Sequence, residues 1–253
     1  MLEGGKKILI WWDDTAQSAS LGINNYLWFQ EGLDVPFEES FPPLLEFIAS
    51  RGVKTPEWIS PQMRSPWRSR AELFGEVVTL DRYQRAPPPE WGMTSEMFAK
   101  EDSPRVKELK EFLERTIPLQ ARFSAQRMVN ALPKMLAASP ANERRKVEKQ
   151  FYRVACSSGG LFNLIDYVNF KGEGVNPKER YRGPGGAKQG WGLLQVLGHM
   201  KGERTGPSAL NEFADSAQWV IKRRVRNAPK ERKKGDGEWL AGWLKRIGNY
   251  RAP

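Results

Sequence analysis

Apolar residues recur at helical spacing over most of the chain from Ser103 to the C-terminus, and this pattern constrains the fold more than any other feature. Ser103-Pro104 is a favourable N-cap and first-turn pair, and apolar residues of 106–113 follow it three or four positions apart. Pro118 limits this helix, because proline cannot donate a backbone hydrogen bond inside one. Further helices are predicted over 119–132, from 142 to the Gly159-Gly160 pair, and over 161–170, 211–227 and 238–247, with a loop at 233–237. The predicted fold class is therefore mainly α (α+β).

The N-terminal part follows a different pattern. Two apolar runs, Ile8–Trp12 and Ser20–Phe29, flank a polar turn at Asp13–Ser18, and this arrangement predicts a small β-hairpin subdomain. A short helix is expected over 44–50, while 53–103 is rich in proline and aromatic residues and is expected to be irregular. We expect one compact two-lobed domain, with the hairpin and the irregular region at 1–102 and the helical region at 103–253.

The composition excludes several classes of protein. The single cysteine, Cys156, allows no internal disulfide, and the single histidine, His199, offers little to a histidine-rich metal site or a histidine-dependent triad. We therefore expect no metal and no cofactor. No run of 18 apolar residues exists, so no transmembrane segment is expected. The apolar run Ile8–Trp12 is too short for a secretory leader. Our hypothesis is that the protein is exported or acts in phage lysis, and that any leader lies outside this sequence.

The chain is strongly basic, with a net charge of +10 and an isoelectric point near 9.7. Lysine and arginine gather at 144–149 and 222–234. Such groups attract nucleic acid, anionic lipid or the acidic polymers of a bacterial wall, although solvated helix faces explain them equally well. No helix-turn-helix, zinc-finger or RNP pattern is present, so we do not expect specific nucleic-acid recognition.

The segment Lys171–Leu197 is the richest in chemistry. Glu173 directly follows a predicted helix end and stands between two glycines, which let a sugar ring approach the backbone. Packing beside Trp191 would remove water from the carboxyl group and favour the neutral, proton-donating form. Gln189, Gln195 and Tyr181 could exchange hydrogen bonds with sugar hydroxyls or an N-acetyl group. The alternatives are a solvated turn for Glu173, backbone pairing for the glutamines and a core position for Trp191.

This segment resembles a known signature. Gly172-Glu173-Gly174-Val175-Asn176-Pro177, followed by Gly190-Trp191-Gly192-Leu193-Leu194-Gln195, is similar to the motif of goose-type lysozymes and soluble lytic transglycosylases. The chain departs from that motif with Leu194 in place of methionine and with Trp191 between the two glycines. The resemblance implies that Glu173 is the catalytic acid and that Gln195 lines the substrate groove.

A second resemblance involves the N-terminal hairpin. Asp14 stands six residues before Ser20, which leads into Leu21-Gly22-Ile23-Asn24-Asn25, and this is similar to the active-site hairpin of phage-type lysozymes. Asn24 and Asn25 replace the glycine and histidine of that family. The resemblance implies Glu3 as a second candidate acid and assigns Asp14 and Ser20 to the catalytic hairpin, with Asn24 and Asn25 at the substrate. Ordinary turn and strand roles are the alternatives for Asp14 and Ser20.

Both resemblances belong to the lysozyme-like superfamily. They imply a lysozyme-like helical fold and cleavage of β-1,4 bonds in an aminosugar polymer, with peptidoglycan first and chitin second among the polysaccharide substrates. We favour Glu173 over Glu3 because its helix and glycine surroundings are intact. The alternative is a catalytically silent glycan- or polyanion-binding protein on the same scaffold. We predict no oligomeric state.

Overall fold

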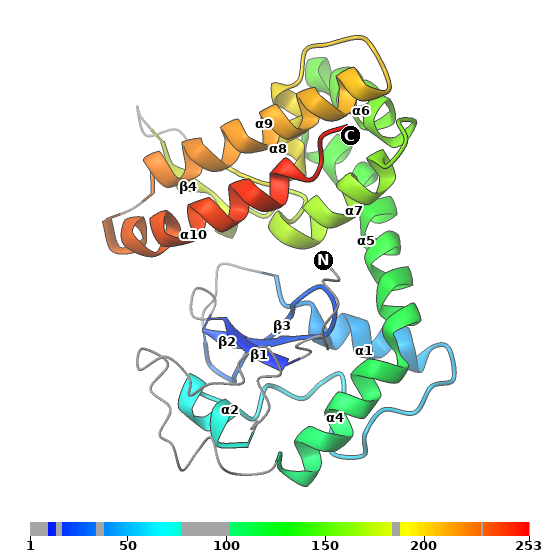
Figure 1. Cartoon of the computed structure of the whole chain (residues 1–253), viewed down its shortest axis with the longest axis vertical. Coiled ribbons are helices and arrows are strands. Elements are labelled where there is room, and N and C mark those ends of the chain that lie inside the picture. Colours follow the sequence, from blue (N-terminus) through cyan, green and yellow to red (C-terminus); the bar gives the residue numbers. More distant parts are fainter. Residues whose placement is uncertain are drawn as a thin grey trace. The chain divides into compact units, whose positions relative to one another are not determined.

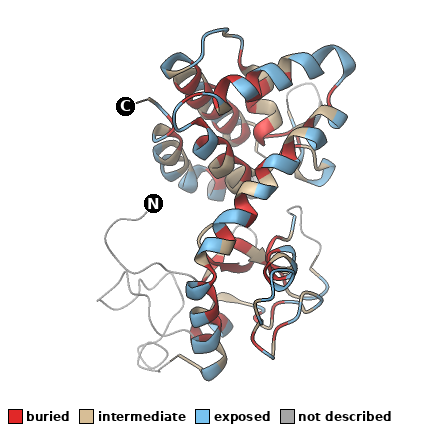
Figure 2. Cartoon of the chain, turned by 90° about the vertical axis from the view of Figure 1, so that its right-hand side faces the viewer, coloured by how far each residue is buried: buried red, intermediate tan, exposed pale blue. Residues whose placement is uncertain are grey.

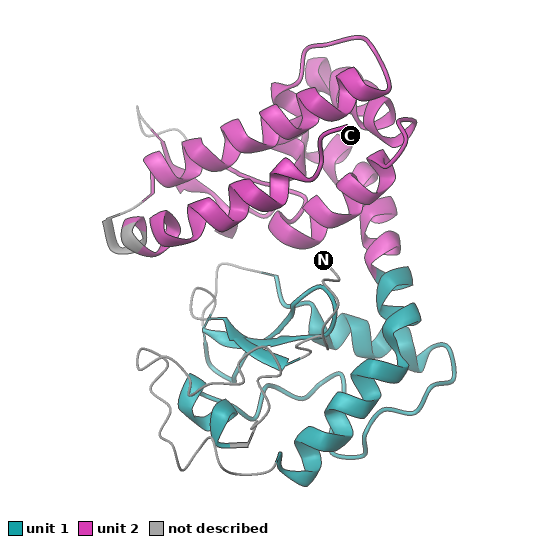
Figure 3. Cartoon of the chain, viewed as in Figure 1, with its two compact units in different colours: residues 1–123 teal, residues 124–253 magenta. Residues whose placement is uncertain are grey.

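The computed structural model describes residues 10–13, 17–33, 38–76, 102–183, 188–228 and 230–252 (Figure 1). Within these residues, buried side chains gather on one face of most helices (Figure 2). The chain divides into two compact units, residues 1–123 and 124–253, and each is described by itself (Figure 3). The predicted mainly α fold with a small β subdomain is confirmed.

The sheet of the first unit has three strands rather than the two of the predicted hairpin. Strands β1 (Ile10–Asp13), β2 (Ser18–Leu21) and β3 (Tyr26–Trp28) pair antiparallel in the order β1-β2-β3. The predicted second strand is interrupted because Gly22 and Asn25 adopt left-handed backbone conformations, with φ of 70° and 55°. A Cβ at Gly22 would lie 2.4 Å from the Gln120 side chain, so this turn packs too closely for another residue.

Helices α1, α2 and α4 also lie in the described part of the first unit. Helix α1 (Phe41–Ala49) begins three residues before the predicted start, because Pro42 and Pro43 are tolerated in its first turn. Helix α2 (Arg70–Glu76) forms inside the stretch expected to be irregular. Helix α4 (Pro104–Arg115) begins at the predicted cap, where the Ser103 hydroxyl accepts a hydrogen bond from the Val106 amide at 3.3 Å.

Aromatic side chains form the centre of this unit. The Trp28 ring is fully buried and packs 5.0 Å from Phe41 and 6.0 Å from Trp67, between ring centroids. Its indole nitrogen donates to the Met63 carbonyl at 2.9 Å. The apolar face of α4 belongs to the same core. The division between the units therefore falls inside α5, not before α4 at the predicted boundary of 102/103.

Helix α5 (Ile117–Ala138) is longer than predicted and contains Pro133. Buried Gln120 connects the first turn of α5 to the sheet. The side-chain oxygen of Gln120 accepts from the Ile23 amide at 3.0 Å, and its backbone carbonyl accepts from the Tyr26 hydroxyl at 2.8 Å. The predicted helices of the second unit are observed as α6 (Ala141–Ala155), α7 (Gly160–Lys171), α9 (Pro207–Arg226) and α10 (Lys230–Gly248), with a short α8 (Leu193–His199).

The predicted loop at 233–237 is wrong, because α10 runs through it. Helices α9 and α10 lie side by side (Figure 1), and Asp236 on α10 forms an ion pair with Arg224 on α9 at 3.1 Å. Both side chains are almost completely buried. The packing of α10 against α9 outweighs the weak helix propensity of Gly235 and Gly237.

Small elements connect α7 to α8. They are a 3-10 turn, η2 (Pro177–Glu179), and the paired strands β4 (Tyr181–Arg182) and β5 (Lys188–Gln189). Among the helices that the structure describes, none is both long and apolar enough to cross a membrane.

Candidate functional site

Glu173 lies just beyond the C-terminal end of α7. Gly172 caps this helix with φ of 71°, and Gly174 has φ of 80°, so the residues on both sides of Glu173 adopt conformations that favour glycine. The predicted helix–Glu–Gly arrangement is therefore present. Glu173 itself is only 6% exposed, which excludes the solvated turn position considered from the sequence.

The N-terminal end of α8 fixes the backbone around Glu173. The amides of Leu193 and Leu194 donate to the carbonyls of Gly172 and Glu173 at 3.0 and 2.9 Å. The Gln195 side chain donates to the Gly174 carbonyl at 3.0 Å and accepts from the Gly192 amide at 2.9 Å. Three consecutive carbonyl groups are thus held by one helix end, and the Glu173 backbone has little freedom to move.

Glycines allow this close approach. A Cβ at Gly192 would lie 2.2 Å from the Gly174 nitrogen, and a Cβ at Gly174 would lie 2.1 Å from the Gln195 side-chain oxygen. Real Cβ atoms do not approach other atoms so closely. The Gly172–Gly174 segment and the Gly190–Gly192 segment therefore pack backbone to backbone, which explains why both parts of the motif are rich in glycine.

Lys134 on α5 is the charged partner of Glu173. Its ammonium nitrogen lies 3.2 Å from Glu173 Oε1. The carboxyl side chain is 7% exposed, whereas the lysine side chain is 50% exposed. The carboxyl group is therefore mostly buried beside a half-exposed cation. Lys134 could not be predicted as this partner from the sequence, because no regular spacing relates it to Glu173.

Trp191 lies in the packed interior of this site. It is 5% exposed, and its carbonyl accepts from the buried Tyr167 hydroxyl at 3.0 Å. Its ring lies 5.9 Å from the Trp243 ring, with the Lys171 ammonium at 4.5 Å and the Arg224 guanidinium at 4.8 Å from the ring centroid. The ring therefore packs as a core side chain that contacts two cations.

Tyr181 and Gln189 face each other across the short β4–β5 pair. Burial raises the pKa of the Tyr181 hydroxyl, while Arg223, Arg224 and Arg226 act against this shift. Gln189 is half-buried, and its side-chain oxygen accepts from the Asn227 amide at 3.5 Å. Both side chains thus belong to the second unit, together with Glu173, Trp191 and Gln195.

The hairpin residues belong to the first unit. Ser20 lies within β2 at 3% exposure, opposite Trp11 and Leu27, and Asn24 and Asn25 occupy the turn between β2 and β3. Glu3 and Asp14 lie outside the described residues. The polar turn predicted at Asp13–Ser18 is described only in part.

Two further results bear on the chemistry. Within the residues that the structure describes, no three His, Cys, Asp or Glu side chains gather in a way that could hold a metal ion. No protein-family model, no curated protein and no solved structure matches the chain.

Proposed function

We propose that this protein is a lysozyme-like enzyme that cleaves β-1,4 bonds in an aminosugar polymer, with Glu173 as the proton donor. The observation that supports this proposal best is a buried carboxyl group on a backbone segment held at three successive carbonyls by α8. Cleavage of a glycosidic bond needs an acid that reaches the leaving oxygen in a fixed position with limited access of water. The burial of Glu173 and the hydrogen bonds that hold its backbone support this assignment.

In this mechanism Glu173 enters the reaction as the neutral acid and donates its carboxyl proton to the oxygen that leaves the anomeric carbon. The half-exposed Lys134 ammonium lies 3.2 Å from one carboxyl oxygen of Glu173 and orients the carboxyl group. After bond cleavage the carboxylate accepts a proton from the group that attacks the anomeric carbon. That group is water in a hydrolase and a hydroxyl of the same sugar in a lytic transglycosylase.

Peptidoglycan is the substrate that the charge of the protein favours. The net charge is +10, and the basic groups at 144–149 and 222–234 both belong to the second unit. Positive surfaces raise the local concentration of anionic polymers and speed their binding. Chitin, which is uncharged, gains nothing from this attraction.

Clearing of a bacterial wall suspension tests the proposal. We expect wild-type protein to clear the suspension and Glu173→Gln, which keeps the size of the side chain, to clear it about 10²–10⁴ times more slowly. Glu179→Gln is the matched control, since it changes the next glutamate of the same segment, and it should clear like wild type. Equal rates for Glu173→Gln and wild type would reject Glu173 as the acid.

The ion pair between Glu173 and Lys134 favours a second candidate, a silent glycan-binding protein in which the pair only stabilises the fold. In that case wild-type protein would be retained on the wall without clearing it. Retention that weakens as the salt concentration rises would identify charge as the cause of binding.

A further inference from the structure

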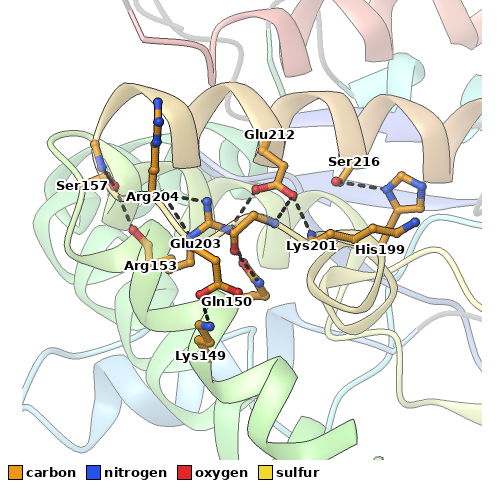
Figure 4. Close-up of polar contacts among 12 residues, drawn as sticks. Lys149, Gln150, Arg153, Ser157, His199, Lys201, Glu203, Arg204, Glu212 and Ser216 are labelled. Atoms are coloured by element: carbon orange, nitrogen blue, oxygen red, sulfur yellow. Dashed lines mark hydrogen bonds and ion pairs between the residues drawn. The ribbon is translucent and has the colours of Figure 1, made fainter.

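A polar network joins α6, the loop after α8, and α9 in the second unit (Figure 4). Glu212 on α9 accepts from the amides of Lys201 and Gly202 at 2.6 and 2.7 Å and from the Arg153 guanidinium at 2.8 Å. Arg153 also donates to the Arg204 carbonyl at 2.6 Å. The network fixes the loop 200–206 and fully engages the Glu212 carboxylate.

His199 stands at one end of this network, at the end of α8. Its Nδ1 lies 3.1 Å from the Ser216 hydroxyl, and its ring stacks on Trp219 with 4.1 Å between centroids and 18° between planes (Figure 4 shows the contact with Ser216). The Arg223 guanidinium lies 4.6 Å from the Trp219 ring centroid. Trp219 is 41% exposed although it is a large aromatic residue. We call His199, Trp219 and Arg223 the aromatic–basic cluster.

The charges that act on His199 are mostly positive. Burial lowers the pKa of His199 below its ordinary value of 6.5, the cations of Lys201, Arg223 and Lys146 lower it further, and Glu212 alone acts in the opposite direction. Lys146 is close because its ammonium donates to the Gly198 carbonyl at 2.5 Å. Positive charge from Lys201, Arg223 and Lys146 thus acts on the imidazole, and the Glu212 carboxylate that opposes it is already engaged by Arg153 and two backbone amides. Such a site gains stability from an added anion.

The aromatic–basic cluster adjoins the proposed cleavage site. His199 follows Gln195 by four residues on α8, so the two side chains lie on the same face of that helix. Gln195 binds the carbonyl next to Glu173, and Arg223 donates to the Gly190 carbonyl at 2.9 Å, directly before Trp191. Helix α8 and the Arg223–Gly190 contact therefore link the two sites within one unit.

We propose that His199, Trp219 and Arg223 form a subsite for an anionic group of the glycan, with the exposed edge of the Trp219 indole beside a sugar ring and the cations against a carboxylate or phosphate. The choice of a glycan rests on the proposed function. The subsite gives this protein a preference for anionic wall glycan over neutral chitin, because only the former carries the negative charge that the cluster accepts.

The single histidine of the chain makes a direct test possible, since its imidazole protons give one NMR titration curve. Soluble carboxylate-bearing peptidoglycan fragments should move the midpoint of that curve upward by about one pH unit, because a nearby anion favours the protonated ring. By linkage, these fragments should bind the protonated form about tenfold more tightly. A neutral tetramer of N-acetylglucosamine should leave the midpoint unchanged. Equal effects of the two glycans, or none from either, would overturn the proposal.

Variants identify the groups responsible. Lys201→Gln removes an exposed charge and should weaken binding of the anionic fragments about threefold, and Trp219→Ala should weaken it about fivefold. Lys245→Gln removes the same charge from an exposed residue of α10; it is the control and should bind like wild type. In wild type, affinity should rise as the pH falls through the titration of His199, and His199→Gln should lose this dependence.

The outcomes separate this proposal from the proposed function, because binding is measured without cleavage. Binding of anionic fragments at His199 by a protein that clears no wall would support the subsite and reject the enzyme. Wall clearing by a protein with equal affinity for both glycans would support the enzyme and reject the subsite. Tighter binding of a single-stranded oligonucleotide than of the wall fragments would overturn the assignment of the ligand.

Discussion

Glu212 illustrates how single residues control stability in the second unit. Burial alone would raise the pKa of its carboxyl group, but the hydrogen bonds from the Lys201 and Gly202 amides and the Arg153 guanidinium lower it below the ordinary 4.5. Asp166 follows the same rule: burial opposes its ionisation, and Arg246, bound at 2.6 and 2.8 Å, lowers its pKa. Carboxyl groups with lowered pKa values stabilise the fold above their ordinary pKa and lose that contribution as the pH falls.

This relation predicts the behaviour of Glu212→Gln. At pH 7 the variant should lose about 2 kcal/mol of unfolding free energy, because Arg153 is left almost completely buried without its charged partner. The difference from wild type should shrink as the pH falls below 4.5, where wild-type Glu212 becomes protonated too. Urea unfolding at several pH values measures both quantities.

Asp215→Asn on the same helix is the control. Asp215 pairs with Arg251, but both side chains are largely exposed, and exposed pairs contribute little to stability. A loss for Glu212→Gln that does not exceed that of Asp215→Asn would contradict the role given to the Glu212 network.

Ion pairs between residues far apart in the chain were the feature of this protein that the sequence predicted least well. Glu173 was identified from its helix end and its glycines, which are local features. Lys134 and Glu173 are 39 residues apart, and Arg153 and Glu212 are 59 apart, so their pairing depends on how the helices pack. Arg224 was interpreted as part of a basic surface, yet it is buried against Asp236. Residue type and spacing contain no information on such contacts.

At the scale of elements, the packing of α8 against the end of α7 organises the candidate site. The α8 amides that have no partner within the helix donate to the carbonyls of Gly172 and Glu173. The free amides at the start of α8 thus pair with the free carbonyls that follow the end of α7. The price of this arrangement is that Gly174 and Gly192 cannot carry a side chain.

Gly192→Ala tests that arrangement. Its Cβ would lie 2.2 Å from the Gly174 nitrogen, which is backbone and cannot move aside cheaply, so we expect a loss of about 1–3 kcal/mol in unfolding free energy. Gly198→Ala lies in the same helix with no atom within 4 Å of its Cβ, and it should be neutral or stabilising by about 0.5–1 kcal/mol. Denaturant midpoints of the two variants provide the comparison, and equal midpoints would show that the close approach does not matter.

Elements with strong local signals were predicted well. Ser103 caps α4 at the predicted start, and the predicted apolar residues Val147, Phe151 and Val154 lie on the buried face of α6. In α7, Leu164 and Val168 are buried as predicted, but Leu161, which has the same spacing, is 51% exposed. The third strand was missed because the turn at Gly22 depends on Gln120, almost a hundred residues away. The α10 helix through Gly235 and Gly237 was missed because it depends on the packing of α10 against α9.

At the scale of the whole molecule, the residues proposed for catalysis and for anion binding lie in one unit. Glu173, Gln195, His199 and Arg223 all belong to residues 124–253, as do both basic groups found in the sequence. The first unit contributes a sheet packed around Trp28, with Ser20 buried inside it. Acid catalysis through Glu173 and attraction of an anionic polymer are therefore expected as properties of the second unit.

Mass spectrometry of soluble fragments from purified peptidoglycan tests the catalytic role of Glu173 most directly. We predict that wild-type protein releases sugar chains cut at β-1,4 bonds, ending either in a reducing sugar or in an intramolecular anhydro ring. Glu173→Gln should release almost none under the same conditions, while Glu179→Gln should match wild type. An absence of fragments with wild-type protein, or their release by Glu173→Gln at the wild-type rate, would contradict the account.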